Sequence, residues 1–326
     1  MGKKLLEVKN LSTCFHTFKG TVKAVDNVSF HIGEGEILGV VGESGAGKSV
    51  TGFSIIGLID EPGKIEAGEI IFNCEDLMKK SESEMNKIRG KEISMIFQDP
   101  MTSLNPVYTI GQQLEEVLLL HENLSKSQRH KKCIELLEAV GISNPESRLK
   151  NYPHQFSGGM RQRVVIAIAL AANPKLIIAD EPTTALDVTI QAQILKLMED
   201  LVRKQGCSLM LITHDLAVVS EMADRIMVMY CGKIVEKGKI EDIVKNYGHP
   251  YTEGLINSIP DLDRDKERLE AIPGIVPNMF NLPTGCNFWP RCRYCKDICK
   301  EKEPELVEVG HDHYVACHFP VRRGEK

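Results

Sequence analysis

The sequence contains no hydrophobic run long enough to cross a membrane. Its longest apolar stretch, VVIAIALAA at residues 164–172, is far shorter than the roughly 20 residues that a membrane-spanning helix needs. The first residues, MGKKLLEVKNL, also lack the sustained apolar segment of a secretory signal, because the chain turns polar at Glu7. We therefore expect no export, and any membrane association should depend on a partner protein.

The chain also lacks a surplus of positive charge. The chain has 40 Lys and Arg against 45 Asp and Glu, which gives a formal net charge of −5. Proteins that bind nucleic acids neutralise phosphates with an excess of Lys and Arg, so no nucleic-acid partner is expected. With 326 residues, of which 42% are hydrophobic and 26% charged, the composition indicates one large globular domain and a smaller part.

Strand-like and helix-like segments alternate along most of the chain. LLEVKNL, AVDNVSF and EILGVVG predict strands near the start, and VTGFSIIGLI predicts a helix immediately after them. Further on, RQRVVIAIALAANP predicts a helix before the strand KLIIADEP, and residues 187–206 predict a helix before the strand CSLMLITHD. This alternation predicts an α/β domain built on a parallel sheet.

Two segments depart from the alternation. QQLEEVLLL and KKCIELLEAVGI predict two amphipathic helices separated by the polar segment HENLSKSQR, and so a helical insertion. After Gly248 the chain contains the charged run DLDRDKERLE and then AIPGIVPN with two prolines. These features predict a linker at residues 259–283, between a domain at 1–258 and a small C-terminal part at 284–326.

A phosphate-binding loop is predicted where the third strand meets the first helix. GESGAGKS has the G-x-x-x-x-G-K-S pattern, in which glycines let backbone N–H groups surround phosphates and the helix N-terminus adds its dipole. The Lys48 ammonium would contact the β- and γ-phosphates, and the Ser49 hydroxyl would bind Mg²⁺. The alternative is an ordinary glycine-rich turn. The predicted nucleotide-binding residues here are Gly42, Glu43, Ser44, Gly45, Ala46, Gly47, Lys48, Ser49 and Val50.

The strand LIIADE ends in two carboxylates. In this position Asp180 would reach Mg²⁺, and Glu181 would lie beside the γ-phosphate, able to polarise a water molecule. On its own the pair is weak evidence, because acidic residues often end strands. Together with the phosphate loop it weighs strongly against the turn alternative.

The segment QFSGGMRQR, residues 155–163, resembles the signature sequence of ATP-binding cassettes (ABC), and residues 4 to about 258 fit that family. The resemblance implies a P-loop ABC ATPase fold, with a RecA-like core sheet, an antiparallel β subdomain and a helical subdomain at about residues 99–160. It also implies that two cassettes close face to face around ATP. Ser157, Gly158 and Gly159 would then bind the γ-phosphate held by the opposite subunit. Met160 departs from the pattern, since most cassettes have Gln there.

The family resemblance assigns further residues. Gln98 resembles the glutamine that contacts Mg²⁺ and the attacking water, and His214 resembles the histidine that positions Glu181, the water and the γ-phosphate. The segment ALD at 185–187 resembles the loop that communicates across the dimer. Phe15 occupies the position of the aromatic residue that stacks on adenine.

The stretch FQDPMTSLNPVYTIGQQL and the tail segments HPYTEGLINSIP and GCNFWPRCRYC resemble the oligopeptide and dipeptide importer branch, which includes nickel importers. This resemblance implies a peripheral protein at the cytoplasmic face of the cell membrane. Its expected partners are two integral-membrane permeases, a second and different ATP-binding subunit, and an external solute-binding protein. The alternatives are a nickel or other small-solute importer, a soluble ABC ATPase acting on nucleic acid or ribosomes, and an exporter.

Half of the ten cysteines lie in the C-terminal part. The spacing of Cys286, Cys292, Cys299 and Cys317 resembles the cysteine pattern of this branch, which implies a [4Fe–4S] cluster. Four thiolates also suit structural Zn²⁺, and a thiol or disulfide role is a third possibility. Cys295 departs from the branch and forms a C-x-x-C pair with Cys292, a spacing that zinc sites favour.

Overall fold

The computed structural model describes residues 3–184, 186–258 and 272–321. The chain divides into two compact units. The first unit contains Gly33–Glu36 and Lys79–Ile212, and the second contains Lys4–Ile32, Ile37–Met78 and Thr213–Lys326. Among the described residues, none of the helices combines the length and apolar character needed to cross a membrane.

The first unit contains three parallel strands in the order β8-β7-β6. β7 is buried at every residue, as its sequence LIIAD predicts for a strand covered on both faces. The strands are β6 (Ile93–Ile96), β7 (Leu176–Asp180) and β8 (Ser208–Thr213). The helices of this unit are α2 (Glu82–Ile88), α3 (Pro100–Ser103), α4 (Ile110–His121), α5 (Lys126–Ala139), α6 (Pro145–Arg148), α7 (Gly158–Leu170) and α8 (Val188–Gln205), with a short 3₁₀ turn at Pro153–Gln155.

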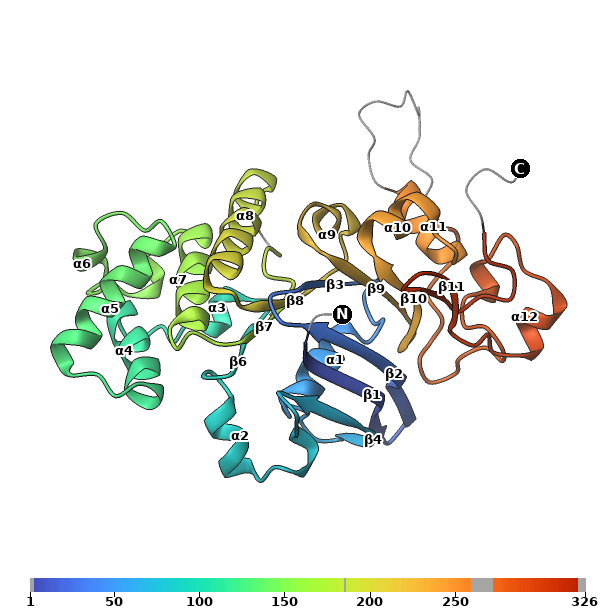
Figure 1. Ribbon diagram of the computed structural model, residues 1–326, viewed down its shortest axis with the longest axis horizontal. Helices are drawn as coiled ribbons and strands as arrows, with labels where there is room; N and C mark the ends of the chain where they lie inside the picture. Colours follow the sequence, from blue (N-terminus) through green and yellow to red (C-terminus); the bar gives the residue numbers. More distant parts are fainter. Residues whose placement is uncertain (1–2, 185, 259–271, 322–326) are drawn as a thin grey trace. The chain divides into compact units, whose positions relative to one another are not determined.

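The two predicted amphipathic helices are present as α4 and α5, and both contact α7 (Figure 1). α4 buries Ile110, Leu114 and Leu118, which recur every four residues and therefore share one face. The polar segment predicted to separate these two helices was too long. Ser125 accepts a hydrogen bond from the Gln128 N–H and starts a capping box, so α5 already begins at Lys126.

The second unit begins with an antiparallel sheet in the order β2-β1-β4-β5, of which Figure 1 labels β1, β2 and β4. Its strands are β1 (Lys4–Thr17), β2 (Gly20–Gly33), β4 (Gly63–Phe72) and β5 (Glu75–Asp76). β1 pairs with β4 in an antiparallel register that places Leu6 opposite Phe72 and Phe15 opposite Gly63. This sheet is the antiparallel part that the family resemblance implied.

A second set of strands in this unit runs in the order β11-β12-β10-β9-β3. β3 and β9 are parallel, whereas β9, β10, β12 and β11 follow one another in antiparallel pairs. The strands are β3 (Ile37–Val41), β9 (Arg225–Tyr230), β10 (Lys233–Lys239), β11 (Val307–Gly310) and β12 (His313–Val315). The helices are α1 (Lys48–Ile55), α9 (Leu216–Met222), α10 (Ile240–Asn246), α11 (Pro250–Asn257) and α12 (Asp297–Glu301), with a 3₁₀ turn at Trp289–Arg291.

The C-terminal strands are tied to β10 by a buried carboxylate. Glu236 of β10 is fully buried, and it accepts hydrogen bonds from the backbone N–H groups of Gly248 and His249. Its Oε1 also lies 2.7 Å from Nε2 of His313 in β12. A buried carboxylate requires such partners. The C-terminal segment therefore extends a strand set of the second unit, while part of the predicted linker, residues 259–271, lies outside the described residues.

Candidate nucleotide site

The predicted phosphate loop connects β3 to α1, as the motif requires. Gly42 to Gly47 form the loop, and Lys48, Ser49 and Val50 form the first turn of α1. Gly47 has φ of 95°, a left-handed conformation that favours glycine. A side chain at Gly42 would collide with the backbone, because its Cβ would lie 2.3 Å from the carbonyl oxygen of Met229. The glycines at these positions are thus required by the loop's own geometry.

Lys48 is held inside this loop. Its Nζ donates to the carbonyl oxygens of Gly42 at 2.7 Å and of Glu43 at 3.1 Å, and the residue is only 5% exposed. The ammonium therefore lies within the curve of backbone that the motif assigns to phosphate.

Two residues that were not predicted from the sequence as site residues form hydrogen bonds with Glu43. Its backbone N–H donates to the hydroxyl of Tyr251 at 2.8 Å. Its carboxylate receives both arms of the Arg291 guanidinium, Nη1 to Oε2 at 2.6 Å and Nη2 to Oε1 at 3.0 Å. Tyr251 and Arg291 lie in the segments HPYTEGL and WPRC, which served only as markers of the family branch. No sequence signal pairs them with the phosphate loop.

The predicted carboxylates are at the end of β7 in the first unit. Asp180 is the last residue of this strand and is 3% exposed. Glu181 follows with φ of 45°, an uncommon value for a residue other than glycine. Its Oε2 accepts hydrogen bonds from Nε2 of Gln98 and Oγ1 of Thr184, each at 3.1 Å. The structure thus brings together Gln98 and Glu181, which are 83 positions apart, and adds Thr184.

The signature segment forms the start of α7. Ser157 is the N-cap residue, and its Oγ accepts a hydrogen bond from the Met160 N–H at 3.3 Å. Ser157 and Gly158 are exposed, whereas Gly159 is partly covered. A Cβ on Gly159 would lie 2.8 Å from the Ile190 side chain, so glycine allows the close approach of α8.

Phe15 and His214 belong to the second unit, like the phosphate loop. Phe15 lies in β1 and is partly exposed. His214 directly follows β8 and is exposed, and the next residue, Asp215, caps α9. Gln98, Asp180, Glu181 and the signature belong to the first unit. Ala185 of the predicted ALD segment lies outside the described residues.

The four predicted cysteine ligands line one small cavity. Cys286, Cys292, Cys299 and Cys317 share it with aromatic and apolar side chains such as Trp289 and Phe319, whereas Cys295 is not part of its lining. All ten cysteines lie within the described residues, and none of them forms a disulfide there. Burial raises the pKa of Cys286 to about 11 and that of Cys317 to about 12.

The next question is whether side chains of the described residues are arranged to bind a metal ion. Among residues 3–184, 186–258 and 272–321, no group of three or more His, Cys, Asp or Glu side chains is arranged to hold a metal ion. The metal module expected from the sequence is therefore not established by the structure.

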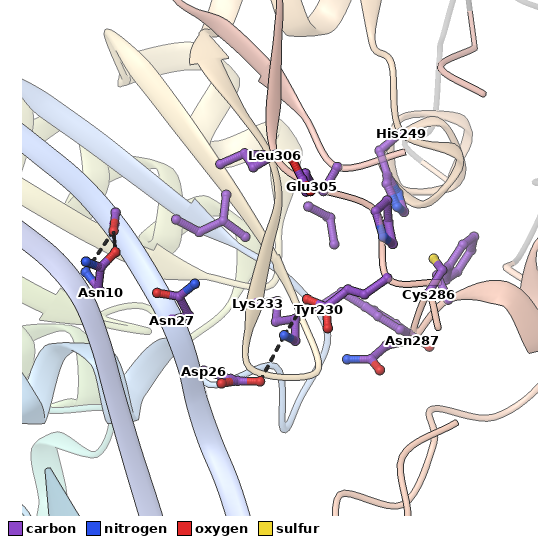
Figure 2. A pocket seen from close by; sticks show the side chains of 17 residues that line it. Asn10, Asp26, Asn27, Tyr230, Lys233, His249, Cys286, Asn287, Glu305 and Leu306 are labelled. Carbon is purple, nitrogen blue, oxygen red and sulfur yellow. Dashed lines mark hydrogen bonds and ion pairs between the residues drawn. The ribbon is translucent and has the colours of Figure 1, made fainter. Parts of the chain in front are cut away.

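A larger cavity of about 390 Å³ lies nearby in the second unit (Figure 2). It is bordered by Asp26 and Asn27 of β2, Lys233 of β10, and Cys286 and Asn287 of the C-terminal segment. The Lys233 ammonium bridges Asp26 at 2.9 Å and Glu303 at 2.5 Å. The phosphate loop does not line this cavity, so it is separate from the predicted nucleotide site.

The loop around Lys48, the acidic end of β7 and the serine-capped signature helix together define an ATPase of the ABC class. Residues 25–184 match the ABC transporter family, and residues 235–299 match the C-terminal region of oligopeptide/dipeptide transporters. The dimeric structure of the ATP-binding cassette MJ0796 bound to ADP and Pi superimposes with a TM-score of 0.65 and 30% identity. That match covers 72% of this chain and 98% of MJ0796.

Close relatives define the branch. The chain is 54% identical to the oligopeptide transport ATP-binding protein AppD of Bacillus subtilis, over 98% of each protein. It is 50% identical to the dipeptide transport ATP-binding protein DppD of Escherichia coli, over 97% of each. The chain belongs to the family of ATP-binding proteins of oligopeptide and dipeptide ABC transporters, and it is an ABC ATPase.

Proposed function

We propose that this chain binds and hydrolyses ATP to energise the uptake of oligopeptides or dipeptides through partner permeases. The observation that carries the proposal is the loop that encloses Lys48, in a chain related over its whole length to peptide transport ATP-binding proteins. The protein acts at the cytoplasmic face of the membrane. It works with two integral-membrane permeases, a second and different ATP-binding subunit, and an external solute-binding protein.

Each site residue has a defined task in this proposal. Residues 42–50 enclose the phosphates, with Lys48 neutralising their charge, and Phe15 stacks on adenine. Ser49, Gln98 and Asp180 hold Mg²⁺, and oxygen donors of this kind suit it. The ion, when bound, neutralises charge on the β- and γ-phosphates.

Hydrolysis requires a positioned water molecule. Glu181 polarises the water, Gln98 and His214 orient it, and Ser157, Gly158 and Gly159 bind the γ-phosphate on the facing subunit. The exposed start of α7 supports this last role, because helix N-terminal N–H groups favour anions. ATP binding closes the dimer and hydrolysis reopens it.

The solute can be tested in cells of the source organism that lack this chain. Wild-type protein should restore uptake of radiolabelled di- and oligopeptides, and Lys48→Ala should not. Restoration of nickel uptake without peptide uptake would assign the chain to the nickel importers instead. Co-purification with nucleic acid or ribosomes rather than integral-membrane proteins would contradict the importer role.

We also propose that Cys286, Cys292, Cys299 and Cys317 hold a [4Fe–4S] cluster, with zinc as the alternative. The donor set fits, because four thiols from distant positions face one cavity with largely apolar walls. A single zinc ion needs all four sulfurs about 2.3 Å from one point. A [4Fe–4S] cluster is also held by four thiolates, so metal and sulfide analysis has to distinguish the two groups.

Iron, sulfide and zinc analysis of anaerobically purified protein tests the cluster. The chain offers a matched pair of variants, because Cys299 lines the cavity and Cys295 does not. Cys299→Ser should lose most of the iron, and Cys295→Ser should retain it. Stoichiometric zinc without sulfide would refute the cluster, and equal loss from both variants would refute the ligand set.

A further inference from the structure

Glu43 places a carboxylate within a loop that binds phosphates. Like charges close together repel, and they repel more strongly in the less polar surroundings of a protein surface than in water. A free carboxylate at this position would therefore oppose the binding of a triphosphate. The structure contains a specific counterion for it.

That counterion is Arg291, 248 positions further along the chain. Its guanidinium meets the Glu43 carboxylate in the two-pronged geometry of the strongest ion pairs. The Arg291 side chain is 3% exposed and that of Glu43 is 30% exposed, so solvent screens the pair poorly. The hydrogen bonds to Glu43 raise the pKa of Arg291, which stays charged.

The arginine is itself held in place by its surroundings. Its Nε donates to the carbonyl oxygen of Pro273 at 2.9 Å, and Nη1 lies 3.4 Å from the Tyr230 hydroxyl. The guanidinium carbon lies 5.9 Å from the ring centres of both Tyr230 and Phe288. Arg291 can therefore fix the carboxylate in one position and not merely neutralise it.

We infer that Arg291 is a positioning residue for ATP binding, which cancels the charge of Glu43 and holds its carboxylate beside Tyr230. The inference rests on the proposed phosphate-binding role of residues 42–49, and it is independent of what the cysteines bind. With this role for Arg291, the C-terminal segment is part of the nucleotide site of the same chain. Because Arg291 contacts Glu43 and is assigned no contact with the reacting phosphate, we expect it to act on ATP affinity more than on turnover.

The test measures the Kd for ATP, the KM for ATP and kcat of Arg291→Met in the full chain. We expect Kd and KM to rise about tenfold, the equivalent of about 1.4 kcal/mol, with little change in kcat. The effect should shrink at about 1 M salt, where the Debye length is about 3 Å. Arg293→Met is the matched control, because Arg293 is 54% exposed and pairs with Glu253 outside the phosphate loop. It should bind ATP like wild type.

A double-mutant cycle separates this role from a purely structural one. Glu43→Gln removes the charge that Arg291 cancels, so adding Arg291→Met to it should have little further effect on Kd. Additive losses would show that Arg291 supports the fold without acting through Glu43. If Arg291→Met does not fold, Arg291→Lys retains the charge but loses the two-pronged geometry, and a smaller rise in Kd is expected.

Lys48→Ala distinguishes the two possible failures. If Lys48→Ala leaves ATP binding intact, the proposed phosphate site is wrong. If Lys48→Ala abolishes binding while Arg291→Met and Arg291→Lys bind like wild type, the phosphate site stands and the role of Arg291 is overturned.

Discussion

The side chain of Gln98 donates a hydrogen bond from Nε2 to Oε2 of Glu181 over 3.1 Å. The two residues follow different parallel strands, β6 and β7, and the carboxyl ends of parallel strands lie at the same edge of a sheet. A glutamine that follows β6 thus contacts the carboxylate that we propose activates the water molecule. This contact leads to the first two predictions.

Glu181→Gln should lower ATP hydrolysis about 100-fold or more, because the amide cannot polarise the attacking water. ATP binding should persist, since the phosphate loop is unchanged, and the variant should accumulate as an ATP-bound dimer. Steady-state ATPase assays and size-exclusion chromatography with ATP would measure both effects. Glu116→Gln on the exposed side of α4 is the control, and unaffected hydrolysis in Glu181→Gln would refute the assignment.

Gln98→Ala should lower kcat about tenfold while changing the Kd for ATP little, because the lost contact orients Glu181 and the loop that binds phosphate is intact. In a Glu181→Gln background the same change should have almost no further effect on hydrolysis. Single-turnover rates of the two single variants and the double variant provide the comparison. Independent, multiplicative losses would show that Gln98 does not act with Glu181.

Ser157 is predicted to have two separable roles. Ser157→Ala removes the N-cap oxygen of α7 and should lower the free energy of unfolding by about 1 kcal/mol. Ser157→Asp keeps a capping oxygen and should be close to wild type in stability. Its negative charge should nevertheless lower the ATPase activity strongly, because it would face the γ-phosphate. Denaturant unfolding and ATPase assays on both variants test this, and an active Ser157→Asp would contradict the phosphate role.

His249 should make the fold sensitive to acid. Burial lowers the pKa of His249 to about 4, from an ordinary value of 6.5, although the nearby Glu236 carboxylate opposes this shift. The folded state therefore favours the neutral ring. Its contribution to stability is complete above about pH 6.5 and is lost as the pH falls from about 6.5 towards about 4. At pH 5 the loss should be about 2 kcal/mol.

The control for this prediction is His249→Asn. The His249 ring accepts a hydrogen bond from the Tyr251 N–H at the start of α11, and Asn also caps helices well. The free energy of unfolding of wild type should therefore fall more steeply below pH 6.5 than that of the variant. Parallel pH profiles would show that the His249 pKa is not depressed.

Much of the fold followed from short-range patterns. The apolar segments before Gly42 and Glu181 predicted buried strands, and the phosphate-loop motif predicted the turn and helix at Lys48. These features depend on neighbours in the sequence, since periodicity and backbone preferences act over a few residues. The boundary at Ser125 was misplaced, because the capping box and the helix-forming residues after it outweighed the polar character of the segment.

Other features required the tertiary structure. Arg291 meets Glu43 across 248 positions and Tyr251 meets it across 208, so no local pattern could pair them. Local sequence patterns also could not show that four of the C-terminal cysteines line one cavity while Cys295 lies outside its lining.

The sequence alone thus determined the ATPase motifs and the family, because each motif is contiguous and its chemistry depends on residue type and spacing. Only the tertiary structure decided which distant side chains support the phosphate loop. Such contacts depend on how strands, turns and the C-terminal segment pack together.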